Sequence, residues 1–205
     1  MKKALFALLT VCIFALLFVS PSATLACACC AEEWTYSINF QAPEKYNLDL
    51  LKEMKFGPSA NLFITEGEDT VKGLNSDSEK YDLSGIFTSK TWKLNFKDEK
   101  GKNGSLSLPL PAKMLTYKVD IHDGKEDGGG GPLLYKELRF EGQVSGTGFF
   151  KSGIIAPTKY FLVFQGRGNN CDNASDFTHW QLVITGKKAD YAFFGKMGSN
   201  NGKRQ

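Results

Sequence analysis

Apolar and polar residues alternate along much of this chain, which is the pattern of β-strands that rest one face on a core. The clearest case is the segment 34–40, which predicts a half-buried strand. Its apolar face carries Trp34, Tyr36, Ile38 and Phe40. Similar apolar faces recur along the chain and predict further strands at 61–65, 91–97, 106–110, 115–121, 134–144 and 191–194.

The two most strand-like runs lie close together in sequence, at 160–164 and 179–184, and predict a β-hairpin. The first run is apolar on both faces, as in a strand that is covered on both sides, whereas the second alternates. The residues between them, 165–178, are rich in glycine, asparagine and aspartate and are too numerous for a tight turn. This loop is therefore the best candidate for a binding site.

A short helix is predicted near the N-terminal side, because Tyr46, Leu50 and Met54 recur every four residues. With about nine or ten strands and at most one short helix, the chain is predicted to be all-β. Long runs favour an antiparallel β-barrel, and a two-sheet β-sandwich is the alternative. In outline such a barrel resembles the lipocalins. Their first strand carries a Gly-x-Trp signature, but here Glu32 stands two residues before Trp34, so the resemblance implies an architecture and no site residues.

Residues 1–26 have the features of a secretory signal peptide, with the cut after residue 26 or as late as residue 28. Lys2 and Lys3 precede an apolar run over 4–19, which is too short to span a bilayer. The mature chain is therefore expected to be exported, to the periplasm or the extracellular space.

A lipoprotein is the alternative, because a cut after Ala26 would place Cys27 at the new N-terminus, where a lipid anchor attaches. Lipoprotein signals usually carry leucine three positions before that cysteine, and Thr24 holds the position here. We therefore favour free release over an anchor on Cys27.

Export leaves 27–197 as a single antiparallel β domain, followed by a polar, disordered tail over 198–205. The 25 basic residues become 23 when Lys2 and Lys3 are removed, against 22 acidic residues. Because the mature chain is near neutral and its basic residues are scattered, nucleic acid is excluded as an expected partner. No later stretch is long and apolar enough to predict a transmembrane segment in the mature chain.

Four cysteines remain after export, and an even number in an exported protein predicts disulfide bonds. They are Cys27, Cys29, Cys30 and Cys171. Cysteines so close in sequence are hard to bridge to one another, so one of the first three is expected to pair with Cys171. No cofactor is predicted on this interpretation. The alternative is a copper or zinc site formed by the same four thiolates.

The favoured function is non-catalytic binding of a small-molecule ligand by the loop 165–178, and a structural role in the cell envelope is a second interpretation. Arg167 stands between two glycines, which would let the backbone bend sharply and present its guanidinium to a carboxylate. A simpler interpretation is that Arg167 pairs with an aspartate and orders its own loop. The predicted ligand-binding residues are Arg167, Asn169, Asp172, Asp176, His179 and Trp180.

The same loop carries residue types that suit two other chemistries. His179 with Ser175 and Asp176 has the residue types of a hydrolase, but the chain lacks a Gly-x-Ser-x-Gly motif, so we expect no enzyme. Asp172 and Asp176 offer oxygen ligands for calcium, but without the spacing of an EF-hand loop.

Overall fold

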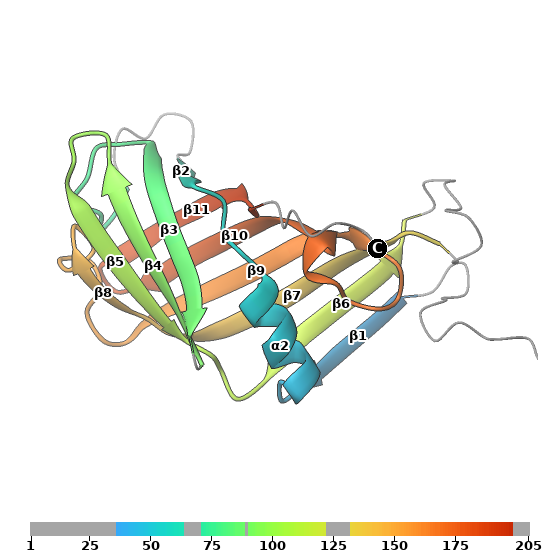
Figure 1. The fold of residues 1–205 in the computed structure, drawn as a ribbon. Coiled ribbons are helices and arrows are strands. Elements are labelled where there is room, and N and C mark those ends of the chain that lie inside the picture. Colours follow the sequence, from blue (N-terminus) through green and yellow to red (C-terminus); the bar gives the residue numbers. More distant parts are fainter. Residues whose placement is uncertain (1–35, 64–70, 89, 122–131, 199–205) are drawn as a thin grey trace, which may run out of the picture.

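The computed structural model of the protein describes residues 36–63, 71–88, 90–121 and 132–198. Within them, eleven strands form one antiparallel sheet (Figure 1). The strands are β1 (Tyr36–Gln41), β2 (Ser59–Phe63), β3 (Lys80–Thr88), β4 (Thr91–Asp98), β5 (Asn103–Pro109), β6 (Met114–Asp120), β7 (Leu134–Gln143), β8 (Ser145–Gly148), β9 (Thr158–Gly168), β10 (Phe177–Gly186) and β11 (Ala189–Lys196). The helices are α2 (Lys45–Glu53) and the 3-10 helix η1 (Ala174–Asp176). The predicted all-β class is confirmed.

The sheet folds over on itself, and at the bend one continuous stretch of chain passes from β7 to β8. The strand order is β1-β6-β7-β9-β10-β11-β2-β3-β4-β5-β8. β7 pairs with β9 up to Gln143, and from Ser145 the same chain pairs with β5 as β8. Between them, the Val144 N–H donates to Thr158 O at 3.0 Å. The strands β3, β4, β5 and β8 therefore stand over the others, as in an open barrel or a sandwich (Figure 1).

Aromatic side chains from both parts of the sheet fill the interior. Trp92 of β4 meets Phe140 of β7 edge-on, with ring centroids 4.8 Å apart, and it also contacts Phe164 of β9. Edge-to-face rings of this kind contribute about 0.5–1.5 kcal/mol beyond the apolar area that they bury. Trp92 and Trp180 are each only 1% exposed, so both belong to the core.

The predicted helix is present as α2. The Glu44 N–H donates to the Asn47 side chain at 2.9 Å, which satisfies one of the free donors at the start of the helix. Leu50 and Leu51 are 4% and 1% exposed and join the core. Nowhere in the described ranges is there a helix with the length and apolarity needed to cross a membrane.

The apolar face of β1 is exposed, so the prediction that this strand is half-buried is wrong. Tyr36, Ile38 and Phe40 are 72%, 61% and 61% exposed. Within the described residues β1 pairs only with β6, at the end of the sheet, and its apolar side chains lie on the outer face beside those of β6. Alternation located the strand, but the folding of the sheet decides which face meets the core.

The loop of the C-terminal hairpin is shorter than predicted, because β9 continues to Gly168 and β10 begins at Phe177. The pairing register shifts between Phe177 and His179, which marks a β-bulge. The predicted signal peptide, Trp34 and the tail beyond residue 198 lie outside the described residues.

Two buried tyrosines differ in whether the hydroxyl group has a hydrogen-bond partner. Tyr160 is 1% exposed and its hydroxyl donates to Pro109 O. Tyr191 is 4% exposed, and its hydroxyl has no hydrogen-bond partner in the described part of the chain. Burial raises the pKa of both phenols, so both are protonated at neutral pH.

We expect opposite effects when each hydroxyl is removed. Tyr160→Phe should lower the free energy of unfolding by about 0.5–1.5 kcal/mol, because it loses a hydrogen bond. Tyr191→Phe should leave that free energy unchanged or raise it by up to about 1 kcal/mol, because it removes an unsatisfied polar group. Urea unfolding measures both variants, and equal losses in the two would contradict the assignment.

Candidate ligand-binding site

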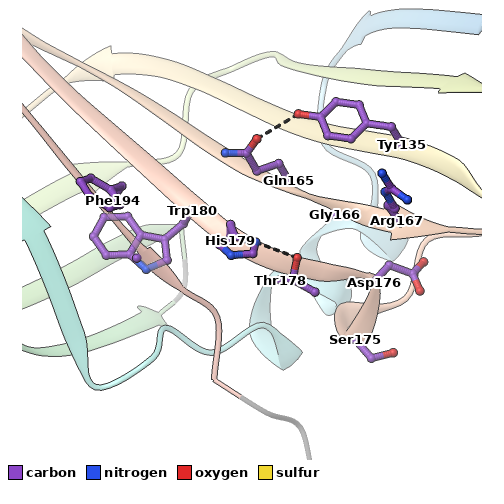
Figure 2. Close-up of a pocket in the computed structure, with 11 residues that line it drawn as sticks. Tyr135, Gln165, Gly166, Arg167, Ser175, Asp176, Thr178, His179, Trp180 and Phe194 are labelled. Carbon is purple, nitrogen blue, oxygen red and sulfur yellow. Dashed lines mark hydrogen bonds between the residues drawn. The ribbon is translucent and has the colours of Figure 1, made fainter. Parts of the chain in front are cut away.

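A surface cleft of about 490 Å³ lies where the C-terminal hairpin meets its neighbouring strands (Figure 2). Tyr135 comes from β7, Arg167 from β9, His179 from β10 and Phe194 from β11, so four strands contribute side chains. The volume falls within the roughly 300–1,000 Å³ that is typical of small-molecule sites.

The strand register explains why these side chains share a face. Tyr135 lies opposite Arg167, and Gln165 lies opposite His179. Directly opposed residues of antiparallel strands point to the same side of a sheet, and here that side is the outer one. Trp180 belongs to the inner face, where its indole packs edge-on against Phe56, and the residue borders the cleft next to the β-bulge.

The cleft combines hydrogen-bond donors with an apolar wall. Arg167 is exposed and carries a permanent charge with five N–H donors. Trp180 is buried, and its Nε1 has no hydrogen-bond partner among the residues that the structure describes. His179 Nδ1 lies 2.9 Å from Thr178 Oγ1, and Phe194 leaves 45% of its surface exposed. This arrangement suits a ligand that joins an anionic or acceptor group to an apolar part.

Tyr135 closes one side of the cleft and is itself held in place. Its hydroxyl lies 2.5 Å from Glu137 Oε1 and 2.9 Å from Gln165 Oε1. Burial, and then the hydrogen bond to Glu137, raise the pKa of this phenol, so it stays protonated at neutral pH. Because Tyr135 contacts the amide oxygen of Gln165, the –NH₂ of that amide points away from Tyr135 (Figure 2).

Beneath the cleft, two lysines of the inner face hold the loop between β9 and β10. The Lys136 side chain is 1% exposed, and its Nζ lies 2.7 Å from Asp176 Oδ2, 3.1 Å from Asp172 Oδ1 and 2.5 Å from Cys171 O. Lys118 Nζ lies 3.0 Å from Asp172 Oδ1. Asp172 Oδ1 therefore sits between two ammonium groups, in electrostatic contacts rather than directed hydrogen bonds. Lys136 Nζ therefore donates to two acceptors, Cys171 O and Asp176 Oδ2, and Asp172 adds a third, electrostatic contact.

Gly166 and Gly168 allow this loop to lie directly on β9. A Cβ at Gly168 would stand 2.3 Å from Asp176 Cγ, and one at Gly166 would stand 1.8 Å from Asp176 O. The glycines on either side of Arg167 therefore permit close approach within a strand, and the sharp bend that the sequence suggested is absent.

The structure brings four of the six predicted ligand-binding residues into the cleft, namely Arg167, Asp176, His179 and Trp180. Asn169 and Asp172 do not line it. Asn169 Oδ1 accepts from the Cys171 N–H at 3.0 Å and shapes the loop. Asp172 turns to the lysines of the inner face.

Sequence reasoning missed Tyr135, Gln165 and Phe194 as cleft residues. Each lies on the outward side of its strand, and that alternation was the available signal. The pairing of β7 with β9, and of β10 with β11, brings them together, and no short-range pattern in the sequence records it.

The hydrolase set is not assembled by hydrogen bonds. His179 contacts Thr178 (Figure 2). The Asp176 carboxylate instead accepts from Lys136 Nζ and from the Asn173 N–H. Since that carboxylate does not orient the imidazole, the arrangement lacks the order that a Ser/His/Asp mechanism requires.

The cysteine predictions stay predictions. Cys27, Cys29 and Cys30 lie outside the described residues, so neither the bridge to Cys171 nor the copper or zinc alternative can be placed. Among the described side chains, no group of three or more histidines, cysteines or carboxylates forms a metal-binding cluster.

A second cleft of about 500 Å³ lies on the same outer face, between β1, β6, β7 and β9. Phe40, Leu115 and Phe161 give it apolar walls, and Lys113 and Arg139 stand among them. Lys113 Nζ lies 5.2 Å from the centre of the Phe40 ring, a cation–π contact that holds this ring in place. None of the residues predicted to bind ligand lies in this second cleft.

We expect Lys136→Met to lower the free energy of unfolding by about 3–5 kcal/mol, because it leaves the Asp176 carboxylate without its cation and Asp172 with Lys118 alone. Lys159→Met is the matched control, since Lys159 pairs with Glu141 at 2.9 Å but both side chains are about 60% exposed. That control should cost at most about 1 kcal/mol. Urea unfolding compares the two variants. Similar losses would show that the contacts of Lys136 with the loop between β9 and β10 do not stabilise the fold.

No family model, curated protein or solved structure matches this chain. The function proposed below therefore rests on the chemistry and geometry of the outer cleft.

Proposed function

We propose that this protein is an exported, non-catalytic binding protein that holds a small amphipathic anion in the outer cleft. The observation that supports the proposal most directly is the exposed guanidinium of Arg167 in the same cleft as the half-exposed ring of Phe194. A carboxylate or sulfonate can accept hydrogen bonds from a guanidinium.

The apolar part of the ligand would lie against Phe194, which is 45% exposed although it is a large aromatic side chain. Burial of such a ring contributes about 25 cal/mol for each Å² of apolar surface removed from water. The donors set the orientation of the ligand, and the ring supplies much of the affinity.

The proposal is tested with two fluorescent probes of similar shape, 1-anilinonaphthalene-8-sulfonate and its uncharged analogue N-phenyl-1-naphthylamine. Arg167→Ala should weaken binding of the sulfonate about tenfold or more, because a hydrogen bond to a charged group contributes about 1.5–3 kcal/mol. The affinity for the uncharged analogue should hardly change. Fluorescence titration, with circular dichroism as a check of folding, measures both.

Arg139→Ala is the matched control, because Arg139 belongs to the second cleft. It should leave sulfonate binding intact. If Arg139→Ala weakens binding while Arg167→Ala does not, the ligand lies in the second cleft and the proposal is wrong. Equal loss for both probes in Arg167→Ala would show that the arginine acts on the fold rather than on the anion.

We further propose that one of Cys27, Cys29 and Cys30 is bridged to Cys171 after export. Cys171 belongs to the loop that Lys136 holds, since its carbonyl oxygen accepts from Lys136 Nζ. A bridge there would tie the N-terminal segment to the same loop. Closing a chain of this length contributes about 4–5 kcal/mol on the chain-entropy model.

Intact-mass spectrometry of the exported protein tests this proposal without reduction. We expect removal of 26 to 28 residues, a loss of two hydrogens for each bridge, and a fragment that joins the N-terminal segment to Cys171 after digestion. Free thiols that retain copper or zinc would favour the metal-binding alternative, and an added diacylglyceryl mass on Cys27 would favour the lipoprotein.

A further inference from the structure

The edge strand β1 lacks the residues that protect most sheet edges from pairing with another strand. Its sequence, Tyr-Ser-Ile-Asn-Phe-Gln, contains no charged residue and no proline. Soluble proteins usually prevent pairing at a sheet edge with lysine, proline, a bulge or a very short strand. The opposite end of this sheet follows that rule, because β8 has only four residues, two of them glycine.

The free edge of β1 is accessible. Within the described residues β1 pairs with β6 along one side only, and residues 36–40 are all exposed. In Figure 1 it forms the outermost strand of its side of the sheet, with α2 lying over the inner face and not beyond the edge. A strand of another molecule can therefore reach the N–H and C=O groups of β1 that have no partner among the described residues.

We propose that β1 pairs antiparallel with β1 of a second copy of this chain, about a twofold axis that passes beside Ile38. In this register Ile38 lies opposite the Ile38 of the second copy, and Tyr36 lies opposite Phe40. The pattern of β1 is the same from either end, with a central aliphatic residue between two aromatic ones, so a twofold axis places apolar residues opposite apolar ones.

The chemistry of the pairing favours a second copy over an unlike partner. β1 carries no charge, so two copies meet without repulsion. Ser37 would lie opposite Asn39 on the inner face, where their side chains can hydrogen-bond. Aromatic and β-branched cross-strand pairs each contribute about 0.2–1 kcal/mol, and here three such pairs would form.

In the dimer, the apolar outer face of one copy would continue into that of the second copy across the twofold axis. The apolar residues of β6 lie beside those of β1 and are half-buried. The ring of Phe40 is already held by Lys113 at 5.2 Å, so ordering it on association costs less entropy. Pairing two strands of six residues buries less surface than a standard interface. We therefore expect a dimer of micromolar affinity that dissociates on dilution.

Cysteine cross-linking tests the register. In the mature protein, Ile38→Cys should form a disulfide-linked dimer rapidly under mild oxidation, because directly opposite Cβ atoms lie about 4.5–5.5 Å apart. Asn39→Cys is the matched control, since residue 39 would lie opposite residue 37, and the two cysteines would be diagonal neighbours about 7–8 Å apart. The unsubstituted protein gives the background from its own cysteines.

Sedimentation velocity over a range of concentrations tests the interface itself. Ile38→Lys should abolish the concentration-dependent dimer, because it places two like charges opposite each other at the axis. Ile86→Lys is the control, because Ile86 is similarly exposed, at 54% against 61%, but lies on β3 inside the sheet. It should leave the dimer unchanged.

Three results would overturn the proposal: a monomer at every concentration, equal cross-linking of Ile38→Cys and Asn39→Cys, or equal loss of the dimer in the two lysine variants. The interface does not depend on the outer cleft beside Arg167, so sulfonate binding should persist in Ile38→Lys.

Discussion

The buried ammonium of Lys136 is the constraint on which the functional end of this protein depends. A charge that is 1% exposed is tolerated only if polar groups surround it, and the loop between β9 and β10 supplies two hydrogen-bond acceptors and the carboxylate of Asp172. To reach the lysine, the loop must lie flat on β9, which is possible because Gly166 and Gly168 leave room for Asp176. The same placement sets one wall of the outer cleft.

The position of this charge follows from the way the sheet folds. β3, β4, β5 and β8 stand over the strands from β7 to β11, and there the inner face is aromatic and dry. Beyond that cover, the inner face of β6 and β7 carries Lys118 and Lys136. Tyr46 of α2 supports the loop there, since its hydroxyl donates to Asp172 O and accepts from the Asp172 N–H. The loop and the helix thus cover the part of the sheet that the second layer leaves open.

A filled interior leaves the candidate binding surfaces on the outside of the sheet. Trp92, Phe140 and Phe164 pack against one another where a barrel with a ligand cavity would be hollow. Both clefts lie on the outer face, and the exposed side chains of β1 lie on the same face. Large apolar residues that remain exposed on one face of a sheet are typical of an interaction surface.

The sequence by itself determined the fold class, the short helix and most of the strands, because these depend on local periodicity. It also located the segment that carries Arg167 and Asp176, since glycine-rich polar segments cannot hold regular structure over their whole length, although Arg167 itself lies at the end of β9. Alternation places Lys136 on an apolar face, and the sequence did not determine that it would be the partner of Asp172 and Asp176. Those aspartates lie 36 and 40 positions further along the chain, beyond the reach of a local pattern.

Only the tertiary structure decided which face of each strand became the inside. β1 alternates without fault, yet its apolar residues face water, because its pairing with β6 turns them to the outer face, away from the second layer. Likewise Tyr135, Gln165 and Phe194 form a site only through the registers of β7 with β9 and of β10 with β11. Alternation shows that a strand has an apolar and a polar face. Which face is buried depends on long-range packing, which a local pattern does not encode.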